Sequence, residues 1–273
     1  MNAPAPSEPN PTACIGVFDS GVGGLSVLRA LHRHLPRSRL LYVADSGHAP
    51  YGERDEAYVV ERSRVLTAHL LREGAQLIVV ACNTATAAAV RALRDEHPDV
   101  HFVGVEPGIK PAIALTRNGR IGVMATRGTL ASDKFRQLVA SHAQGAQLHL
   151  QACAGLAHAI EAGDADSAEV RRLVAQHTAP LRAAHVDTVV LGCTHYPFVA
   201  QHIQAALGAE VRLVDTADAV ARRAQQIAAT LQPAGDAVFE PARLWTTGAL
   251  STLQLVARKW LDFETETLAL PAN

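Results

Sequence analysis

The chain contains 273 residues, of which 48% are hydrophobic and 19% charged, and its formal net charge is −1. This composition is typical of a globular α/β protein and excludes a fibrous or largely disordered chain. A charge so close to zero provides no broad positive field, so we expect no nucleic-acid partner. No apolar run reaches the roughly 18 residues that span a bilayer, so we expect no membrane partner either.

The first thirteen residues, MNAPAPSEPNPTA, contain four prolines and neither a basic residue nor an apolar core. They lack the features of a secretory signal, so we expect a disordered N-terminal tail at 1–13 and a cytoplasmic protein. In that reducing compartment the cysteines should stay unpaired. The four cysteines are Cys14, Cys82, Cys153 and Cys193.

Short β-branched runs alternate with Ala- and Leu-rich amphipathic stretches along most of the chain. This alternation predicts an α/β fold in which mainly parallel sheets are flanked by helices on both faces. The expected strands lie at 14–18, 40–44, 77–81, 101–105, 120–124, 146–151, 188–192 and 211–214. The expected helices lie at 25–34, 57–73, 85–97, 130–142, 167–184 and 198–207.

Two segments of the first half return in the second half. Residues 15–21 (IGVFDSG) resemble residues 121–127 (IGVMATR), and residues 77–84 (LIVVACNT) resemble residues 188–195 (TVVLGCTH). Because the two offsets, 106 and 111 residues, are nearly equal, we predict two pseudo-symmetric α/β domains that face each other. Parallel sheets bind ligands at the carboxyl ends of their strands, where all four segments carry polar residues.

The repeat gives Cys82 and Cys193 matched positions, each after an apolar strand and before polar residues that start a helix. Two opposed thiols suit removal of a proton from one face of a carbon and its return on the other, because a thiol with a pKa of about 8.5 reaches both protonation states. A helix N-terminus should lower that pKa further. A lone cysteine after a strand is more often part of the core, and we assign Cys14 and Cys153 to it.

Several motifs resemble those of the glutamate racemases in the cofactor-independent Asp/Glu racemase superfamily, from Ile15 to about Leu261. The motifs are 19–24 (DSGVGG), Asp45 with 50–52 (PYG), 82–84 (CNT), 106–107 (EP), 125–129 (ATRGT), 192–197 (GCTHYP) and 246–248 (TTG). The resemblance implies two facing α/β domains, with the end of the chain returning to the first. We expect the first domain at 14–110 plus 216–262, the second at 111–215, and a C-terminal tail at 263–273.

The resemblance also implies roles for individual residues. Cys82 and Cys193 match the two acid/base thiols of the family, Asp19 matches the carboxylate that assists the first, and His195 with Glu161 matches the pair that assists the second. Glu161 is placed by its distance of eight residues from Cys153, in a stretch where Ala154 replaces the usual proline. Asp19 and His195 also match substrate-contacting positions. The other expected substrate-lining residues are Ser20, Pro50, Tyr51, Gly52, Asn83, Thr84, Thr126, Thr129 and Thr194.

The activity implied is interconversion of L- and D-glutamate without a cofactor, in order to supply D-glutamate for peptidoglycan. The partner is then a small-molecule substrate, and the sequence leaves open whether the protein is a monomer or a homodimer. No His-Glu-x-x-His motif occurs, so we expect no metal.

Other functions are less well supported. A nucleotide-binding oxidoreductase would need glycine at position 26, where Ser26 stands, and no Gly-Lys-Ser/Thr of a phosphate-binding loop follows. A pyridoxal enzyme would need a Schiff-base lysine, and none of the three lysines has a persuasive context. Aspartate and hydantoin racemases are closer alternatives, and His195 after Cys-Thr resembles the glutamate group. A binding module of the same fold would not need both thiols.

Overall fold

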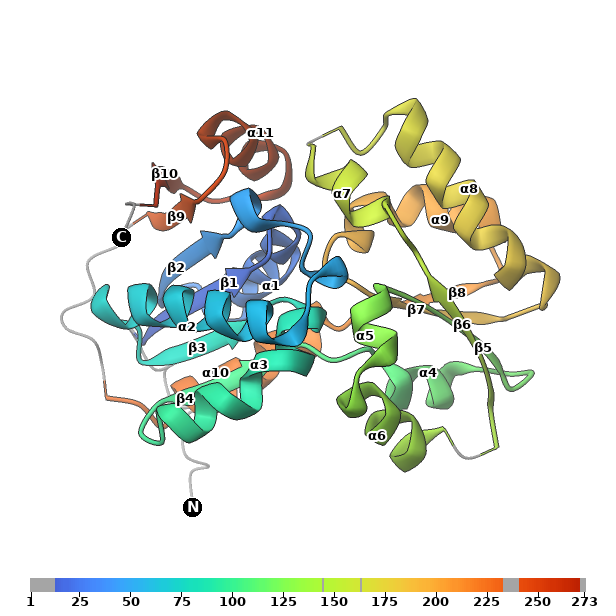
Figure 1. Cartoon of the computed structure of the whole chain (residues 1–273), viewed down its shortest axis with the longest axis horizontal. Coiled ribbons are helices and arrows are strands. Elements are labelled where there is room, and N and C mark those ends of the chain that lie inside the picture. Colours follow the sequence, from blue (N-terminus) through green and yellow to red (C-terminus); the bar gives the residue numbers. More distant parts are fainter. Residues whose placement is uncertain (1–12, 144, 163, 233–240, 271–273) are drawn as a thin grey trace, which may run out of the picture.

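A computed structural model describes residues 13–143, 145–162, 164–232 and 241–270, so most of the predicted N-terminal tail lies outside the described residues. These residues form two sheets side by side, each flanked by helices, as shown in Figure 1. Every strand pairing within the described ranges is parallel. The structure is therefore the predicted α/β fold.

The first sheet has six strands in the order β10-β9-β2-β1-β3-β4. Its strands are β1 (Cys14–Asp19), β2 (Arg39–Ala44), β3 (Leu77–Val80), β4 (His101–Gly104), β9 (Ala242–Thr246) and β10 (Thr265–Ala269). Helices α2 (Glu56–Arg72) and α3 (Asn83–Glu96) cover one face, and α1 (Leu25–His34), α10 (Ala217–Ala228) and α11 (Leu250–Trp260) lie on the other. The central strands are apolar, except for Asp19 at the end of β1, because helices bury both of their faces.

The second sheet has four strands in the order β6-β5-β7-β8. Its strands are β5 (Arg120–Ala125), β6 (Gln147–Ala152), β7 (Thr188–Gly192) and β8 (Arg212–Val214). One face packs against α7 (Leu156–Glu161), α8 (Ala168–Ala183) and α9 (Ala200–Leu207), and the other against α4 (Ile109–Leu115) and α6 (Asp133–His142). Helix α5 (Arg127–Ala131) follows β5 directly.

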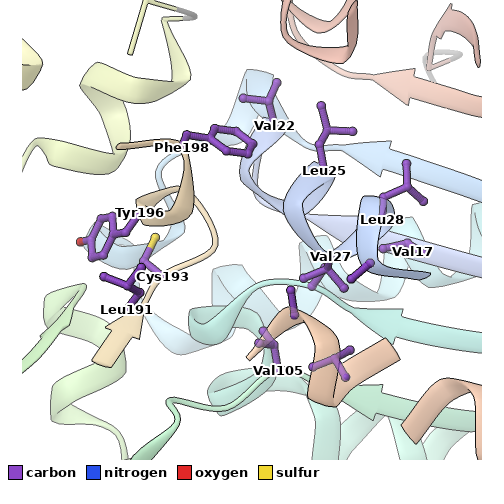
Figure 2. Packing of buried hydrophobic residues seen from close by; sticks show 14 of the residues in the cluster. Val17, Val22, Leu25, Val27, Leu28, Val105, Leu191, Cys193, Tyr196 and Phe198 are labelled. Carbon is purple, nitrogen blue, oxygen red and sulfur yellow. The ribbon is translucent and has the colours of Figure 1, made fainter. Parts of the chain in front are cut away.

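One hydrophobic cluster joins the two halves. It contains Val22 and Leu25 from the first half together with Leu191, Tyr196 and Phe198 from the second. Figure 2 shows Phe198 beside Val22, where the two halves meet. Burial of these side chains against one another favours the observed placement of the two sheets. The carboxyl ends of β1, β3, β5 and β7 are thereby held around one place.

All eight predicted strands are present, and no strand end is displaced by more than one residue. The helix predicted at 130–142 is wrong in detail, because the extended backbone of Ser132 separates α5 from α6. The Ser132 hydroxyl accepts the Phe135 N–H at 3.1 Å and so caps α6.

The predicted C-terminal tail at 263–273 is also wrong in part, because β10 pairs with β9 at the edge of the first sheet, while residues 271–273 lie outside the described residues. Strands β9 and β10 and helices α4, α7, α10 and α11 were not predicted. Strand β10 reads Thr-Glu-Thr-Leu-Ala and is half-exposed, so it carries only a weak apolar pattern. In the described part of the chain, no helix is both long and apolar enough to cross a membrane.

The C-terminal strand pair should contribute to the stability of the first half. Leu244 in β9 is fully buried, so we expect Leu244→Ala to lower the free energy of unfolding by about 2–5 kcal/mol in urea denaturation. Leu255→Ala is the control, because that side chain is 58% exposed and its loss should change stability by at most about 0.5 kcal/mol. Equal effects of the two substitutions would contradict a structural role for β9.

Candidate active site

Polar residues at the carboxyl ends of four strands, two from each sheet, line one pocket. Ser20 follows β1, Cys82 follows β3, Thr126 follows β5 and Cys193 follows β7. Parallel sheets bind ligands at this edge. The other lining residues are Ala49, Pro50, Tyr51, Gly52, Asn83, Thr84, Ala157, His158, Glu161, Gly192, Thr194 and His195.

Twelve of the fourteen site residues predicted from the sequence line this pocket. The other two, Asp19 and Thr129, are buried behind it and hydrogen-bonded to lining residues. Sequence reasoning missed Ala49, Ala157, His158 and Gly192, and of these only Gly192 stands in a recognised motif.

Cys82 is the N-cap of α3, where its sulfur accepts the Ala85 N–H at 3.5 Å. Its thiol points to the Ser20 hydroxyl, with Sγ and Oγ 3.6 Å apart. Burial, and then the charge of Asp19, raise the pKa of Cys82 well above its ordinary range. The Ala85 N–H at the start of α3 lowers this pKa, as expected for a helix N-terminus, but burial has the larger effect and the net pKa is raised.

Asp19 ends β1 and is fully buried. One carboxylate oxygen accepts the Ser20 N–H at 2.7 Å and the Ser20 hydroxyl at 3.3 Å, and the other accepts the Thr194 hydroxyl at 3.1 Å. Burial raises the pKa of Asp19 from 3.8 to about 6, and the charge of His195 opposes part of this rise. Cys82, Ser20 and Asp19 thus form a chain of hydrogen bonds along which a proton can move.

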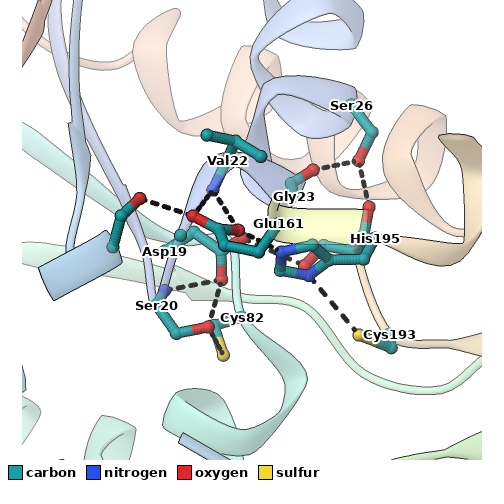
Figure 3. Close-up of polar contacts among 12 residues, drawn as sticks. Asp19, Ser20, Val22, Gly23, Ser26, Cys82, Glu161, Cys193 and His195 are labelled. Atoms are coloured by element: carbon teal, nitrogen blue, oxygen red, sulfur yellow. Dashed lines mark hydrogen bonds and ion pairs between the residues drawn. The ribbon is translucent and has the colours of Figure 1, made fainter. Parts of the chain in front are cut away.

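Cys193 begins a second chain of contacts, shown in Figure 3. Its sulfur lies 3.7 Å from Nδ1 of His195, and Nε2 of that ring lies 2.6 Å from Oε2 of Glu161. Burial lowers the pKa of His195, but its contacts with Cys193 and Glu161 outweigh burial and raise the pKa well above 6.5. Each thiol therefore has its own ionisable assembly, a carboxylate for Cys82 and an imidazole with a carboxylate for Cys193.

Glu161 belongs to the second half but is bound by the first. Its two oxygens accept the Val22 N–H at 3.1 and 2.9 Å. A Cβ atom at Gly21 would collide with the carboxylate of Glu161, and one at Gly23 would collide with the imidazole of His195. The glycine-rich turn after β1 therefore gives room to this carboxylate and imidazole, which explains its glycines without a dinucleotide.

The rest of the pocket wall supplies neutral hydrogen-bonding groups. The Thr84 hydroxyl lies 3.0 Å from that of Thr126 and 3.3 Å from that of Thr129. Oδ1 of Asn83 is buried without a partner. Neither lysine nor arginine is among the residues that line the pocket. Such a wall can hold carboxylates and an ammonium through hydroxyls, amides and backbone groups.

The two remaining cysteines lie in hydrophobic packing. Cys14 and Cys153 are both buried, and burial raises the pKa of Cys153 to about 12, so this thiol stays protonated at neutral pH. Within the described residues, no three His, Cys, Asp or Glu side chains gather so as to hold a metal ion.

The close approach of Gly23 to His195 gives a direct test of this arrangement. We expect Gly23→Ala to displace the imidazole and to lower the amino-acid racemisation expected from the sequence by about a hundredfold, the usual effect of a misplacement of about 1 Å. Gly74→Ala is the control. Its φ of +93° makes the substitution strained, but no atom lies within 4 Å of the added Cβ, so it strains the backbone without displacing the imidazole. An active Gly23→Ala enzyme would show that the imidazole need not sit there.

Comparisons with known proteins agree with this geometry. Residues 15–224 match the family described as Asp/Glu/Hydantoin racemase. A glutamate racemase of Ectopseudomonas mendocina is 46% identical over 244 residues, which are 89% of this chain and 93% of the relative.

Two solved structures are similar over nearly the whole chain. The glutamate racemase of Escherichia coli, in complex with L-glutamate and the activator UDP-MurNAc-ala, has a TM-score of 0.83 and 37% identity, and the match covers 97% of this chain and 100% of that one. The RacE1 isoform of Bacillus anthracis glutamate racemase has a TM-score of 0.83 and 34% identity, with 95% and 97% covered. The resemblance seen in the motifs is thereby confirmed, and the chain belongs to the Asp/Glu/hydantoin racemase family.

Proposed function

We propose that the protein is a glutamate racemase that interconverts L- and D-glutamate through two thiols. The observation that carries this proposal is that Cys82 and Cys193 follow corresponding strands, β3 and β7, of the two sheets and line one pocket. The substrate is supported by relatives named as glutamate racemases, one of them solved with L-glutamate.

In one direction, the Cys82 thiolate takes the α-proton, and the electron pair of the broken C–H bond stays on the substrate. The Cys193 thiol then gives its proton to the opposite face, so that the product has inverted configuration and the two sulfurs have exchanged states. The reverse reaction exchanges their roles. Catalysis by such positioned groups rests on proton transfer at the reacting carbon.

The assisting groups restore the two sulfurs. Asp19 takes the Cys82 proton through the Ser20 hydroxyl, which accepts from the thiol and donates to the carboxylate. His195 exchanges a proton with Cys193, and Glu161 fixes the orientation of the imidazole and stabilises its charged form. The wall of Asn83, Thr84 and the neighbouring hydroxyls would bind the substrate's polar groups and hold the α-carbon between the sulfurs.

The domain assignment is part of the same proposal. Residues 14–110 with 216–262 would form one domain and residues 111–215 the other, and closure between them would exclude water from the site. The four free cysteines suit the reducing cytoplasm, where the enzyme would supply D-glutamate for peptidoglycan.

Incubation with L-glutamate in D₂O, without added cofactor, tests the reaction. We expect loss of optical rotation together with one solvent deuterium at the α-carbon of the D-product. Cys82→Ala and Cys193→Ala should each abolish racemisation in both directions, since both faces need a thiol, whereas Cys14→Ala should stay active because it lies in the core. Conversion of L-aspartate alone would replace the proposed substrate, and full activity of either thiol variant would refute the two-thiol mechanism.

The pKa of Asp19 predicts the acidic limb of the pH profile. Its carboxylate gains a proton as the pH falls through about 6, and the protonated group no longer accepts a proton from Cys82. We therefore expect kcat/KM to fall below pH 6 in the wild type. Asp19→Asn should reduce kcat/KM by roughly 10²–10⁴-fold and remove this limb. A limb at pH 6 that persists in Asp19→Asn would assign it to another group.

A further inference from the structure

The motif Thr246-Thr247-Gly248 and the residue Asp45 have no role in the proposed function, yet they meet directly behind the site. The Thr247 hydroxyl donates to Oδ1 of Asp45 at 2.9 Å and accepts the Gly47 N–H at 3.0 Å. Asp45 is fully buried and also accepts two hydrogen bonds from Arg62, each 2.9 Å long. A buried carboxylate with this many partners is fixed in position.

Asp45 and its hydrogen-bond partners determine the path of the chain after β2. Asp45 precedes a short 3-10 turn, Ser46–His48, and its Oδ2 also accepts the hydroxyl of Tyr51, which lines the pocket. Thr247 ties the middle of the turn through Gly47. The segment 45–51 is therefore closed by the hydrogen bond between Asp45 and Tyr51, and its middle is bound to Thr247 through Gly47.

The turn presents Ser46 to the other half of the molecule. The Ser46 hydroxyl donates to Oε1 of Glu161 at 2.5 Å, while Oε2 of the same carboxylate lies 2.6 Å from Nε2 of His195. Ser46 does not line the pocket, so it reaches the reacting atoms only through Glu161. With the Val22 N–H it is the second group of the first half that binds this carboxylate.

We propose, on the basis of the proposed function, that Ser46 is a positioning residue for His195 and Cys193, acting through Glu161, and that Thr247 and Asp45 hold it there. The inference gives the late threonine motif a function. It also means that the imidazole beside Cys193 is aligned only while the two halves are closed, because its carboxylate is anchored on the opposite half.

Removal of the hydroxyl should act on turnover and not on substrate binding. We expect Ser46→Ala to lower kcat for glutamate by about ten- to a hundredfold, the effect of one hydrogen bond to a charged group, with KM changed less than about twofold. Alkylation of Cys193 by iodoacetamide, located by mass spectrometry, should slow in parallel, because a loosened imidazole takes the thiol proton less well. Alkylation of Cys82 should keep its wild-type rate.

Two variants serve as controls. Ser46→Thr retains the hydroxyl and should restore most of kcat. Ser141→Ala removes a hydroxyl that binds only a carbonyl of its own helix, Gln137 O at 2.8 Å, and should behave as the wild type. Thr247→Val keeps the shape of the side chain but loses both hydrogen bonds, and should reproduce the Ser46→Ala pattern more weakly.

Wild-type kcat and Cys193 alkylation in Ser46→Ala would overturn the inference, as would equal slowing of alkylation at both thiols, which would indicate a general structural effect. If the wild-type protein does not racemise glutamate, the proposed function fails. The selective effect on Cys193 alkylation would still decide whether Ser46 positions the imidazole.

Discussion

The hydrogen bonds that Glu161 makes across the two halves are the interaction on which the site depends. The carboxylate comes from α7 of the second half, accepts from Val22 and Ser46 of the first, and lies against His195 of its own half. Leaving a largely buried carboxylate with fewer partners is costly, so these contacts favour one relative placement of the halves. The glycine-rich turn after β1, whose glycines give room to the carboxylate and imidazole, is the sequence feature that permits this approach.

Burial gives the two thiols different surroundings within one pocket. Cys82 lies near the carboxylate of Asp19, whose pKa is about 6. Cys193 lies against the imidazole of His195, whose own pKa is raised well above 6.5. The Cys82 pKa is raised, because desolvation outweighs the single N–H at the start of α3. The proposed mechanism therefore needs Asp19 as an acceptor close to neutral pH, because the thiol alone would rarely be ionised.

Much of the fold follows from local sequence. The interior strands are continuous apolar runs followed by polar residues, so their ends are predictable within one residue, and the internal repeat is enough to assign Cys82 and Cys193 to one pocket. Edge strand β10 was missed because it is half-exposed and carries only a weak apolar pattern. Strand β9 lies between β2 and β10, and Arg243 interrupts its apolar run. The position of Ser46 on Glu161 joins residues 115 positions apart, and no local pattern encodes such a contact. The pKa of Cys82 likewise depends on burial, which spacing does not reveal.

The return of the chain to its first sheet has a consequence for synthesis on the ribosome. Strand β2 pairs with β9, and Asp45 bonds Thr247, 202 positions later, so the entire four-stranded half is made between these partners. Contacts of such sequence separation form slowly. A nascent chain that has emerged only through β8 thus contains Cys82 and Cys193. Its strand β2 still lacks the partner β9, and the Ser46–His48 turn lacks its hydrogen bond to Thr247. An unpaired strand edge of this kind favours association with other chains until β9 and β10 are made.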